Sequence, residues 1–232
     1  MNECLSSFLS LSKIFADNGY KLFLVGGSVR DYLLEKVEFD LDVVTDATPL
    51  EMSQFLSKEN CDYTFDKFGA VRYFGFNRRF DITTLRKEED YIDYRRPNKI
   101  TFVKDIKIDA IRRDFTINAM YMDASLTIFD FYNGQQDLKN HLLKMVGNPF
   151  IRLKEDPLRI IRGLRFASDF DLNIDIDLSN AIIENKKLLT LINPLKIKED
   201  ILKTYPIKKD KLELLLDKYK LLDYLKCGRE DK

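Results

Sequence analysis

The strand-forming patterns of this 232-residue chain stop at Gly147-Asn148-Pro149. Before that point, short apolar runs such as Leu22–Val25 predict buried strands, and they alternate with segments whose apolar residues recur at helical spacing. After it, the helical spacing continues with almost no strand signal. We therefore expect an α+β domain over residues 1–146, with a small mixed sheet flanked by helices, and an all-helical part over residues 147–232.

Charge indicates a partner only through its distribution. Lys and Arg together number 38, and so do Asp and Glu, so the net charge favours no class of partner. Residues 186–220 nevertheless carry 10 lysines against 5 acidic residues. Such a basic segment could face a phosphate backbone, and a solvated helical surface explains it equally well.

Cysteine and histidine usage excludes several classes of site. The three cysteines are far apart and odd in number, which argues against a disulfide framework or a Cys-x-x-Cys metal site. With His141 as the single histidine, zinc sites that need two or more are excluded. Residues 1–15 lack the basic start of a secretory signal, and no apolar run approaches the roughly 18 residues of a membrane helix. We expect a soluble, cytoplasmic protein that does not contact membranes.

The first candidate site is Asp40-Leu41-Asp42, in a stretch with strand alternation. Two residues apart on a strand, both carboxylates point to the same face. Like charges held so close repel unless a cation lies between them, and hard carboxylate oxygens suit Mg²⁺. By itself the pattern is weak, because solvent-facing acids often alternate in this way.

A glycine-rich turn precedes these acids by about ten residues. Gly26-Gly27-Ser28-Val29-Arg30-Asp31 follows the buried strand and opens a helix, with Ser28 as the expected N-cap. Glycines let backbone N–H groups approach phosphate oxygens, and Arg30 adds a positive charge. The pattern is neither a dinucleotide-binding fingerprint nor a P-loop. A tight strand-to-helix turn with an Arg–Asp surface pair remains the alternative.

A third stretch is Arg112-Arg113-Asp114-Phe115-Thr116-Ile117-Asn118-Ala119. Guanidinium groups fit phosphate oxygens, so the paired arginines could bind a triphosphate while Asp114 or Asn118 binds a ribose hydroxyl. A solvated helix face would contain the same residue types.

A fourth stretch runs from Glu155 through Asp156, Pro157 and Arg159 to Arg162. Pro157 favours a helix start, and Asp156 and Arg159 share a helix face. A carboxylate beside a guanidinium offers acceptors and donors together, as a base edge does. An N-cap with an internal ion pair is the alternative.

In order and spacing, the four stretches together resemble the class II tRNA nucleotidyltransferase (CCA-adding) and bacterial poly(A) polymerase family. The resemblance covers roughly residues 20–170 and is specific as a set. It implies a nucleotidyltransferase head with a small mixed sheet, followed by a helical neck and a short body that select the nucleotide and bind RNA.

The resemblance also implies roles for single residues. Asp40 and Asp42 would be catalytic and would bind Mg²⁺, and Asp81, in the strand Phe80–Leu85, is a candidate third metal ligand. The residues that would bind the nucleotide are Gly26, Gly27, Arg30 and Arg113 at the triphosphate, Asp114 at the ribose, Asp156 and Arg159 at the base, and Arg162.

The segment between Arg86 and Arg112 is similar to the flexible loop of the family. Asp93-Tyr94-Arg95-Arg96-Pro97 falls where CCA-adding members carry a similar motif, usually with His at the place of Tyr94. The loop has its full length, which favours addition of complete CCA.

The implied reaction is attack of a tRNA or other RNA 3′-hydroxyl on the α-phosphate of CTP or ATP. An A-adding enzyme or a poly(A) polymerase is the alternative within the family, and a non-catalytic RNA-binding subunit is the alternative outside it. Family members usually continue for over a hundred further residues that grip tRNA. We expect either a minimal enzyme or a grip that is reduced or supplied by a partner or a second copy.

Overall fold

The computed structural model describes residues 2–91, 94, 97–204 and 206–222, which form two compact units. The first unit contains Met1–Glu88, Lys99–Arg113 and Ile117–Gln135, and the second contains Glu89–Asn98, Asp114–Thr116 and Gln136–Lys232. A functional division at residue 147 stays a prediction.

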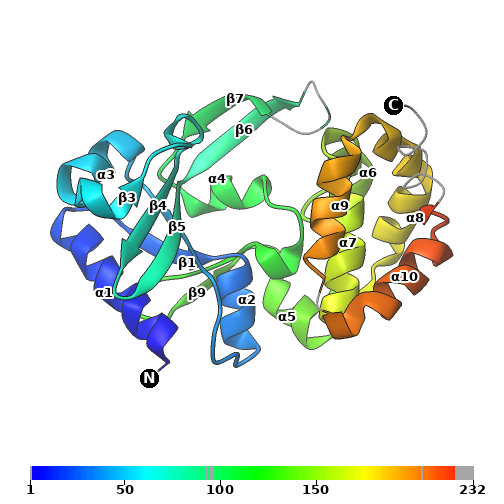
Figure 1. The fold of residues 1–232 in the computed structure, drawn as a ribbon, viewed down its shortest axis with the longest axis horizontal. Helices are drawn as coiled ribbons and strands as arrows, with labels where there is room; N and C mark the ends of the chain where they lie inside the picture. The colour runs from blue at the N-terminus through cyan, green and yellow to red at the C-terminus, as the bar shows by residue number, and fades with distance from the viewer. Residues whose placement is uncertain (1, 92–93, 95–96, 205, 223–232) are drawn as a thin grey trace. The chain divides into compact units, whose positions relative to one another are not determined.

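A mixed seven-stranded sheet forms the centre of the first unit (Figure 1). In order across the sheet, the strands are β3 (Cys61–Asp62), β4 (Ala70–Gly75), β5 (Arg78–Thr84), β2 (Leu41–Thr45), β1 (Leu22–Val25), β8 (Met120–Met122) and β9 (Ile128–Asp130). Among these neighbours only β2 and β5 run parallel. The predicted fold class, an α+β domain with a small mixed sheet, is confirmed.

Alternation along the central strands gives the sheet two different faces. Leu41, Val43, Phe80 and Ile82 belong to a large apolar core. Val44, on the opposite face, belongs to a smaller cluster. Because side chains on a strand alternate between faces, the residues between the members of the large core point to the face of the smaller cluster.

The helices of the first unit cover these faces unequally. Helix α1 (Glu3–Asp17) buries Phe8, Leu11 and Phe15 in the large core, to which α3 (Pro49–Phe55) adds Met52. On the other face, α4 (Ile106–Ile111) contributes Ala110 to the smaller cluster. Polar side chains on that face are therefore left partly accessible. Short 3₁₀ helices occupy Lys58–Asn60, Asp66–Phe68 and Thr116–Asn118.

Two local predictions differ from the structure. Helix α2 spans Gly27–Leu33 with Gly26 as its N-cap, so the prediction that Ser28 caps this helix was wrong. Gly26 has φ 64° and ψ −123°, a conformation open to glycine alone, which moves the helix start two residues earlier. Strand β2 begins at Leu41, so Asp40 directly precedes the strand rather than lying within it.

The charged stretch after Arg86, predicted without regular structure, contains a two-stranded sheet of β6 (Arg86–Tyr91) and β7 (Pro97–Phe102). Its charged residues hide the apolar alternation from which strands are recognised. Of the motif Asp93–Pro97, Asp93, Arg95 and Arg96 lie outside the described residues.

The second unit is built around α7 (Leu158–Asp169), which packs against α6, α9 and α10 (Figure 1). Gly163 on α7 allows close packing, because an added Cβ would come within 3.0 Å of the Phe115 ring. The other elements are α5 (Gly134–Lys139), which begins in the first unit, β10 (Leu142–Leu143), α6 (Pro149–Glu155), β11 (Asn173–Ile174), α8 (Ile176–Asn185), α9 (Pro194–Leu202), α10 (Lys209–Lys218) and two 3₁₀ helices (Lys186–Leu191 and Pro206–Lys208).

Among the described residues, none of the helices combines the length and apolar character that crossing a membrane requires.

Candidate active site

Three acidic residues cluster on the accessible face of the sheet in the first unit. Asp42 on β2 lies in register with Asp81 on the parallel strand β5. Asp40, two residues before Asp42, is exposed. The pKa of Asp42 is raised to about 6, mainly by burial of the carboxyl group and further by the charges of Asp40 and Asp81. The positive charges of Arg30 and Arg113 therefore do not fully compensate burial and the neighbouring acids at Asp42.

A hydroxyl group fixes the backbone that carries the two predicted metal ligands. Ser28 Oγ donates a hydrogen bond to the carbonyl of Asp40 (2.6 Å) and accepts one from the amide of Asp42 (2.9 Å). Ser28 is buried on α2. The start of α2 is thereby tied to both ends of the Asp40-Leu41-Asp42 segment, a link that the sequence analysis missed because it assigned Ser28 to a helix cap.

The acid cluster fits a divalent cation as a two-carboxylate site. Within the described part of the chain, no group of three or more acidic, histidine or cysteine side chains is arranged to hold a metal ion. Asp81 instead accepts a hydrogen bond from Arg72 Nε (3.0 Å) and pairs with Arg79 Nη2 at 3.3 Å. Asp40 and Asp42 could hold Mg²⁺, which commonly uses one or two carboxylates together with water and phosphate oxygens. A ligand role for Asp81 stays a prediction.

Arg30, from the glycine turn, is buried close to these acids. Its Nη1 donates to Asn118 Oδ1 (2.7 Å), and its Nε donates to Asp31 Oδ1 (2.8 Å). The guanidinium charge lowers the pKa of Asp42, against the larger effects of burial and the neighbouring acids. Arg30 is therefore a fixed positive charge beside the carboxylates rather than half of a surface pair.

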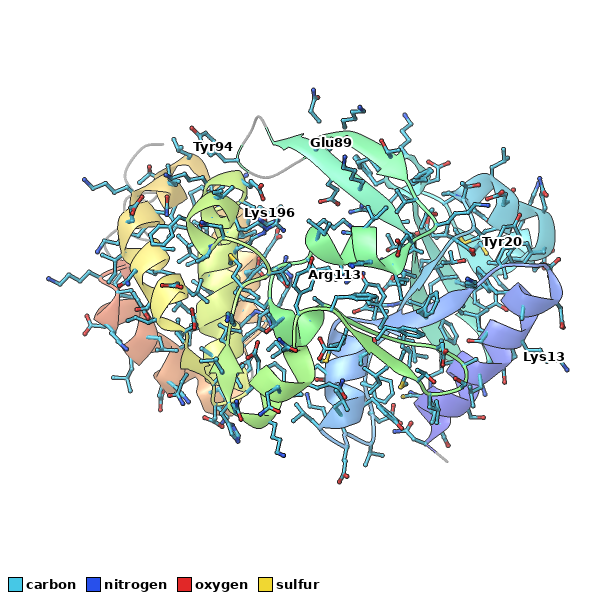
Figure 2. The ribbon with its side chains drawn as sticks, turned by 180° about the vertical axis from the view of Figure 1, so that it is seen from behind. Lys13, Tyr20, Glu89, Tyr94, Arg113 and Lys196 are labelled. Atoms are coloured by element: carbon cyan, nitrogen blue, oxygen red, sulfur yellow. The ribbon has the colours of Figure 1, made fainter. Side chains whose placement is uncertain are left out.

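Arg113 lies just past the end of α4 (Figure 2). Its Nε and Nη2 donate to Asp109 Oδ2 at 3.2 and 2.9 Å. Its guanidinium carbon is 5.1 Å from the centre of the Tyr121 ring. An added Cβ on Gly26 would be 3.5 Å from Arg113 Nη1, so this arginine faces the glycine turn. The predicted triphosphate residues Gly26, Arg30 and Arg113 are thus brought together.

The second unit contains a cavity of about 310 Å³ that is lined in part by two other predicted residues. Asp156 and Arg162 line this cavity, with Leu158, Arg165, Asp200 and Lys203. Arg162 forms an ion pair with buried Asp114, and that carboxylate raises the pKa of Arg162. Asp114, Asp156 and Arg162 therefore form one polar group within this unit.

Arg159 is placed differently from its neighbours. It is 5% exposed, and its Nη1 donates to the Arg152 carbonyl (2.8 Å) and to Glu155 Oε2 (3.1 Å) at the end of α6. Its Nε is 4.0 Å from Asp156 Oδ2. Asp156 itself accepts a hydrogen bond from the Leu158 amide (3.1 Å), so its side chain binds the first amide of α7, although the N-cap residue of that helix is Pro157.

The polar residues that the sequence analysis missed include Ser28, Asp109 and Tyr121. For Asp109 a signal existed, because it precedes Arg112 by three residues and Arg113 by four, the spacings of ion pairs on a helix. For Tyr121, which pairs across the sheet with Val25, no local spacing announces the contact.

Comparison with known proteins agrees with this geometry. Residues 22–144, more than half of the chain, match the family model described as the poly A polymerase head domain. The chain belongs to the poly A polymerase head-domain family. The match includes the glycine turn, the acid cluster and Arg113.

Similar proteins in this family carry the name CCA-adding enzyme. The one from Staphylococcus epidermidis is 42% identical over 170 residues, 73% of this chain and 42% of the relative. The one from Lactobacillus helveticus is 42% identical over 187 residues, 81% of this chain and 46% of the relative. The chain therefore spans just under half the length of these relatives.

Solved structures of the family extend the likeness to both units. The Bacillus stearothermophilus CCA-adding enzyme in complex with CTP superposes with a TM-score of 0.83 at 29% identity, covering 94% of this chain and 53% of that one. A tRNA nucleotidyltransferase complexed with a primer tRNA and an incoming ATP analog gives a TM-score of 0.78 at 26% identity, covering 96% and 64%.

The raised pKa of Asp42 leads to a prediction about stability. Between the ordinary value of 3.8 and about 6, the unfolded carboxyl ionises while the folded one stays protonated, so rising pH destabilises the folded state. Asp42→Asn removes this penalty. Without divalent cations, the variant should exceed the wild type in unfolding free energy by about 1–3 kcal/mol above pH ~6, with no difference below pH ~4.

Urea unfolding across this pH range measures the effect, and Asp40→Asn is the matched control. Because Asp40 is exposed, its replacement should change stability much less. An Asp42→Asn variant that is less stable than the wild type above pH ~6 would contradict the electrostatic argument.

Proposed function

We propose that this chain is a template-independent RNA nucleotidyltransferase that adds CCA to tRNA 3′ ends. CTP and ATP are the nucleotide donors, Mg²⁺ is the cofactor, pyrophosphate is the second product, and the reaction takes place in the cytoplasm. The proposal is supported mainly by one observation, the acid cluster around Asp42 with Arg30 and Arg113 close enough to lower the pKa of Asp42.

The chemistry of phosphoryl transfer explains why this cluster supports the proposal. The RNA 3′-hydroxyl attacks the α-phosphorus, the bond to the β-phosphate oxygen breaks, and pyrophosphate leaves. Mg²⁺ held by Asp40 and Asp42 would offset the charge of the triphosphate and promote loss of the hydroxyl proton. Arg30 and Arg113 would bind and orient the triphosphate, with Gly26 and Gly27 allowing its close approach. Ser28 would keep both carboxylates in place.

Nucleotide choice is assigned to the second unit. Asp156 lines the cavity beside Arg162, and Asp114 would bind the ribose. If Arg159 binds the base together with Asp156, its guanidinium must give up its hydrogen bonds to Glu155 and the Arg152 carbonyl. It would then donate to the edge of the base instead. The tRNA substrate follows from the similarity to the CCA-adding enzymes named above. The basic segment over residues 186–220 would contact its phosphates, assisted by further protein surface from a partner or a second copy.

The experiment is nucleotide addition by the purified chain to a tRNA that lacks its 3′ CCA. With CTP and ATP together the RNA should lengthen by three nucleotides, and with CTP alone by two. Asp42→Ala should abolish addition while the protein stays folded, because truncation of a partly accessible acid costs little stability. Addition of A alone, or of a long A tract, would support the related activities instead. Near-normal activity of Asp42→Ala with Mg²⁺ present would contradict the assigned site.

A second prediction separates base reading from helix capping at Asp156. Asp156→Asn keeps a side-chain oxygen for the Leu158 amide, since Asn caps helices about as well as Asp. It replaces one acceptor by a donor, and a mispaired polar group at a desolvated base costs about 1.5–3 kcal/mol, roughly 10- to 150-fold in discrimination. The variant should therefore lose discrimination among the four NTPs with an unchanged melting temperature.

Asp156→Ala is the companion variant, and it should lose both functions. Removal of the cap should cost about 0.5–2 kcal/mol of stability in addition to the loss of discrimination. If Asp156→Asn keeps wild-type nucleotide preference while Asp156→Ala is only destabilised, the residue caps the helix and does not read the base.

A further inference from the structure

Asp109 is a fully buried carboxylate to which the proposed reaction gives no role. It lies on α4 with 0% exposure. An ionised carboxylate without partners would be very costly at such a place. Although burial alone would raise it, the charges of Arg113 and Arg112 hold the pKa of Asp109 well below its ordinary range. The group is therefore an anion at every physiological pH, and its value to the protein lies in what it binds.

The two oxygens of Asp109 bind different parts of the first unit. Oδ1 accepts from Arg112 Nε (2.7 Å) and from the backbone amide of Arg86 (3.1 Å). Oδ2 accepts from Arg113 Nε (3.2 Å) and Nη2 (2.9 Å) and from the Tyr121 hydroxyl (2.7 Å). One carboxylate thus binds two consecutive arginines, each through a different oxygen.

Arg112 also contacts a second acidic residue, Glu88. Its Nη1 donates to Glu88 Oε1 at 3.3 Å, and the same oxygen accepts from Arg86 Nε at 2.8 Å. The side chain of Glu88 is 8% exposed. Arg112 therefore belongs to a buried ionic network at the base of β6.

Arg113 is held by a different set of contacts. Its Nε donates both to Asp109 and to the Tyr121 hydroxyl (2.8 Å), and the guanidinium lies over the Tyr121 ring. Tyr121 is completely buried, so the platform beneath the guanidinium is rigid. With Nε and Nη2 bound to Asp109, the fork is held so that Nη1 faces Gly26. A fork fixed in this way loses little further freedom when it binds an anion.

We propose that Asp109 is a positioning residue, which holds Arg113 toward the glycine turn so that its guanidinium meets the triphosphate of the incoming nucleotide. This inference rests on the proposed function, because it takes the ligand at the turn to be a nucleoside triphosphate. Asp109 acts only through Arg113, and Tyr121 is the second support of the same guanidinium.

The test is binding of CTP, measured by calorimetry without RNA, to Asp109→Asn and to Arg113→Gln. Asn has the size of Asp but lacks the charge and one acceptor, so Arg113 loses its fixed orientation. We expect Asp109→Asn to weaken CTP binding by about 10-fold, the size of effect known for metal ligands that lose the group orienting them. In steady-state kinetics the KM for CTP should rise more than kcat falls.

The double variant Asp109→Asn/Arg113→Gln decides whether the effect passes through Arg113. It should bind CTP no more weakly than Arg113→Gln alone, because a positioning residue has nothing left to orient. Effects that multiply in the double variant would overturn the inference. The matched control is Asp137→Asn, a buried carboxylate that accepts from the Thr116 hydroxyl (2.7 Å), which should leave CTP affinity unchanged.

Tyr121→Phe covers the case in which Asp109→Asn does not fold. It removes the hydroxyl shared by Arg113 and Asp109 and keeps the ring, and it should weaken CTP binding by about 2- to 5-fold. Wild-type affinity in this variant would then overturn the inference. A wild-type protein that binds CTP but adds nothing to RNA would contradict the proposed function and leave the positioning role intact. Normal nucleotide addition by a folded Asp109→Asn with wild-type CTP affinity would overturn the positioning role alone.

Discussion

The parallel pairing of β2 with β5 places Asp42 in register with Asp81, on a face where Asp42 is also largely withdrawn from solvent. Burial of Asp42, together with the charges of Asp40 and Asp81, sets the electrostatics of the first unit. Burial and the nearby acids raise the pKa of Asp42 to about 6, so the fold carries an energetic penalty at neutral pH. Such a penalty is typical of sites that bind or transform a ligand.

Some arginines of the first unit form ion pairs with the acid cluster, and others influence it through their charge. Arg72 and Arg79 neutralise Asp81 directly, whereas Arg30 and Arg113 act on Asp42 over a longer range. Asp31 and Asn118 bind Arg30, and Asp109 binds Arg113. These partners keep both guanidinium groups from collapsing onto the acids. Positive and negative side chains therefore stay apart, as the proposed binding of a cation and a triphosphate requires.

Local rules predicted the parts of this arrangement that depend on neighbours in sequence. The strand period placed Asp42 on the face opposite the large core, although Asp40 directly precedes the strand. The division after residue 146 stays a prediction, since the second unit also contains residues 89–98, 114–116 and 136–146. The link from Ser28 to the acid backbone was missed, because the cap assignment ignored the conformation that only Gly26 adopts. The network around Asp109 joins α4, β6 and β8, and no periodicity in one segment predicts contacts among three. Spacing alone predicted the proximity of Arg159 to Asp156, which the 4.0 Å ion pair bears out, but it did not predict the hydrogen bonds of Arg159 to the last turn of α6.

We propose that the acids around Asp42 form a divalent-cation site that a nucleoside triphosphate completes. Mn²⁺ tests this directly, because its electron paramagnetic resonance signal falls when the ion binds protein. We predict saturable Mn²⁺ binding near neutral pH that Mg²⁺ displaces, that CTP strengthens, and that Asp42→Asn largely abolishes. Absence of saturable binding with and without CTP, or equal binding by the wild type and Asp42→Asn, would contradict the account.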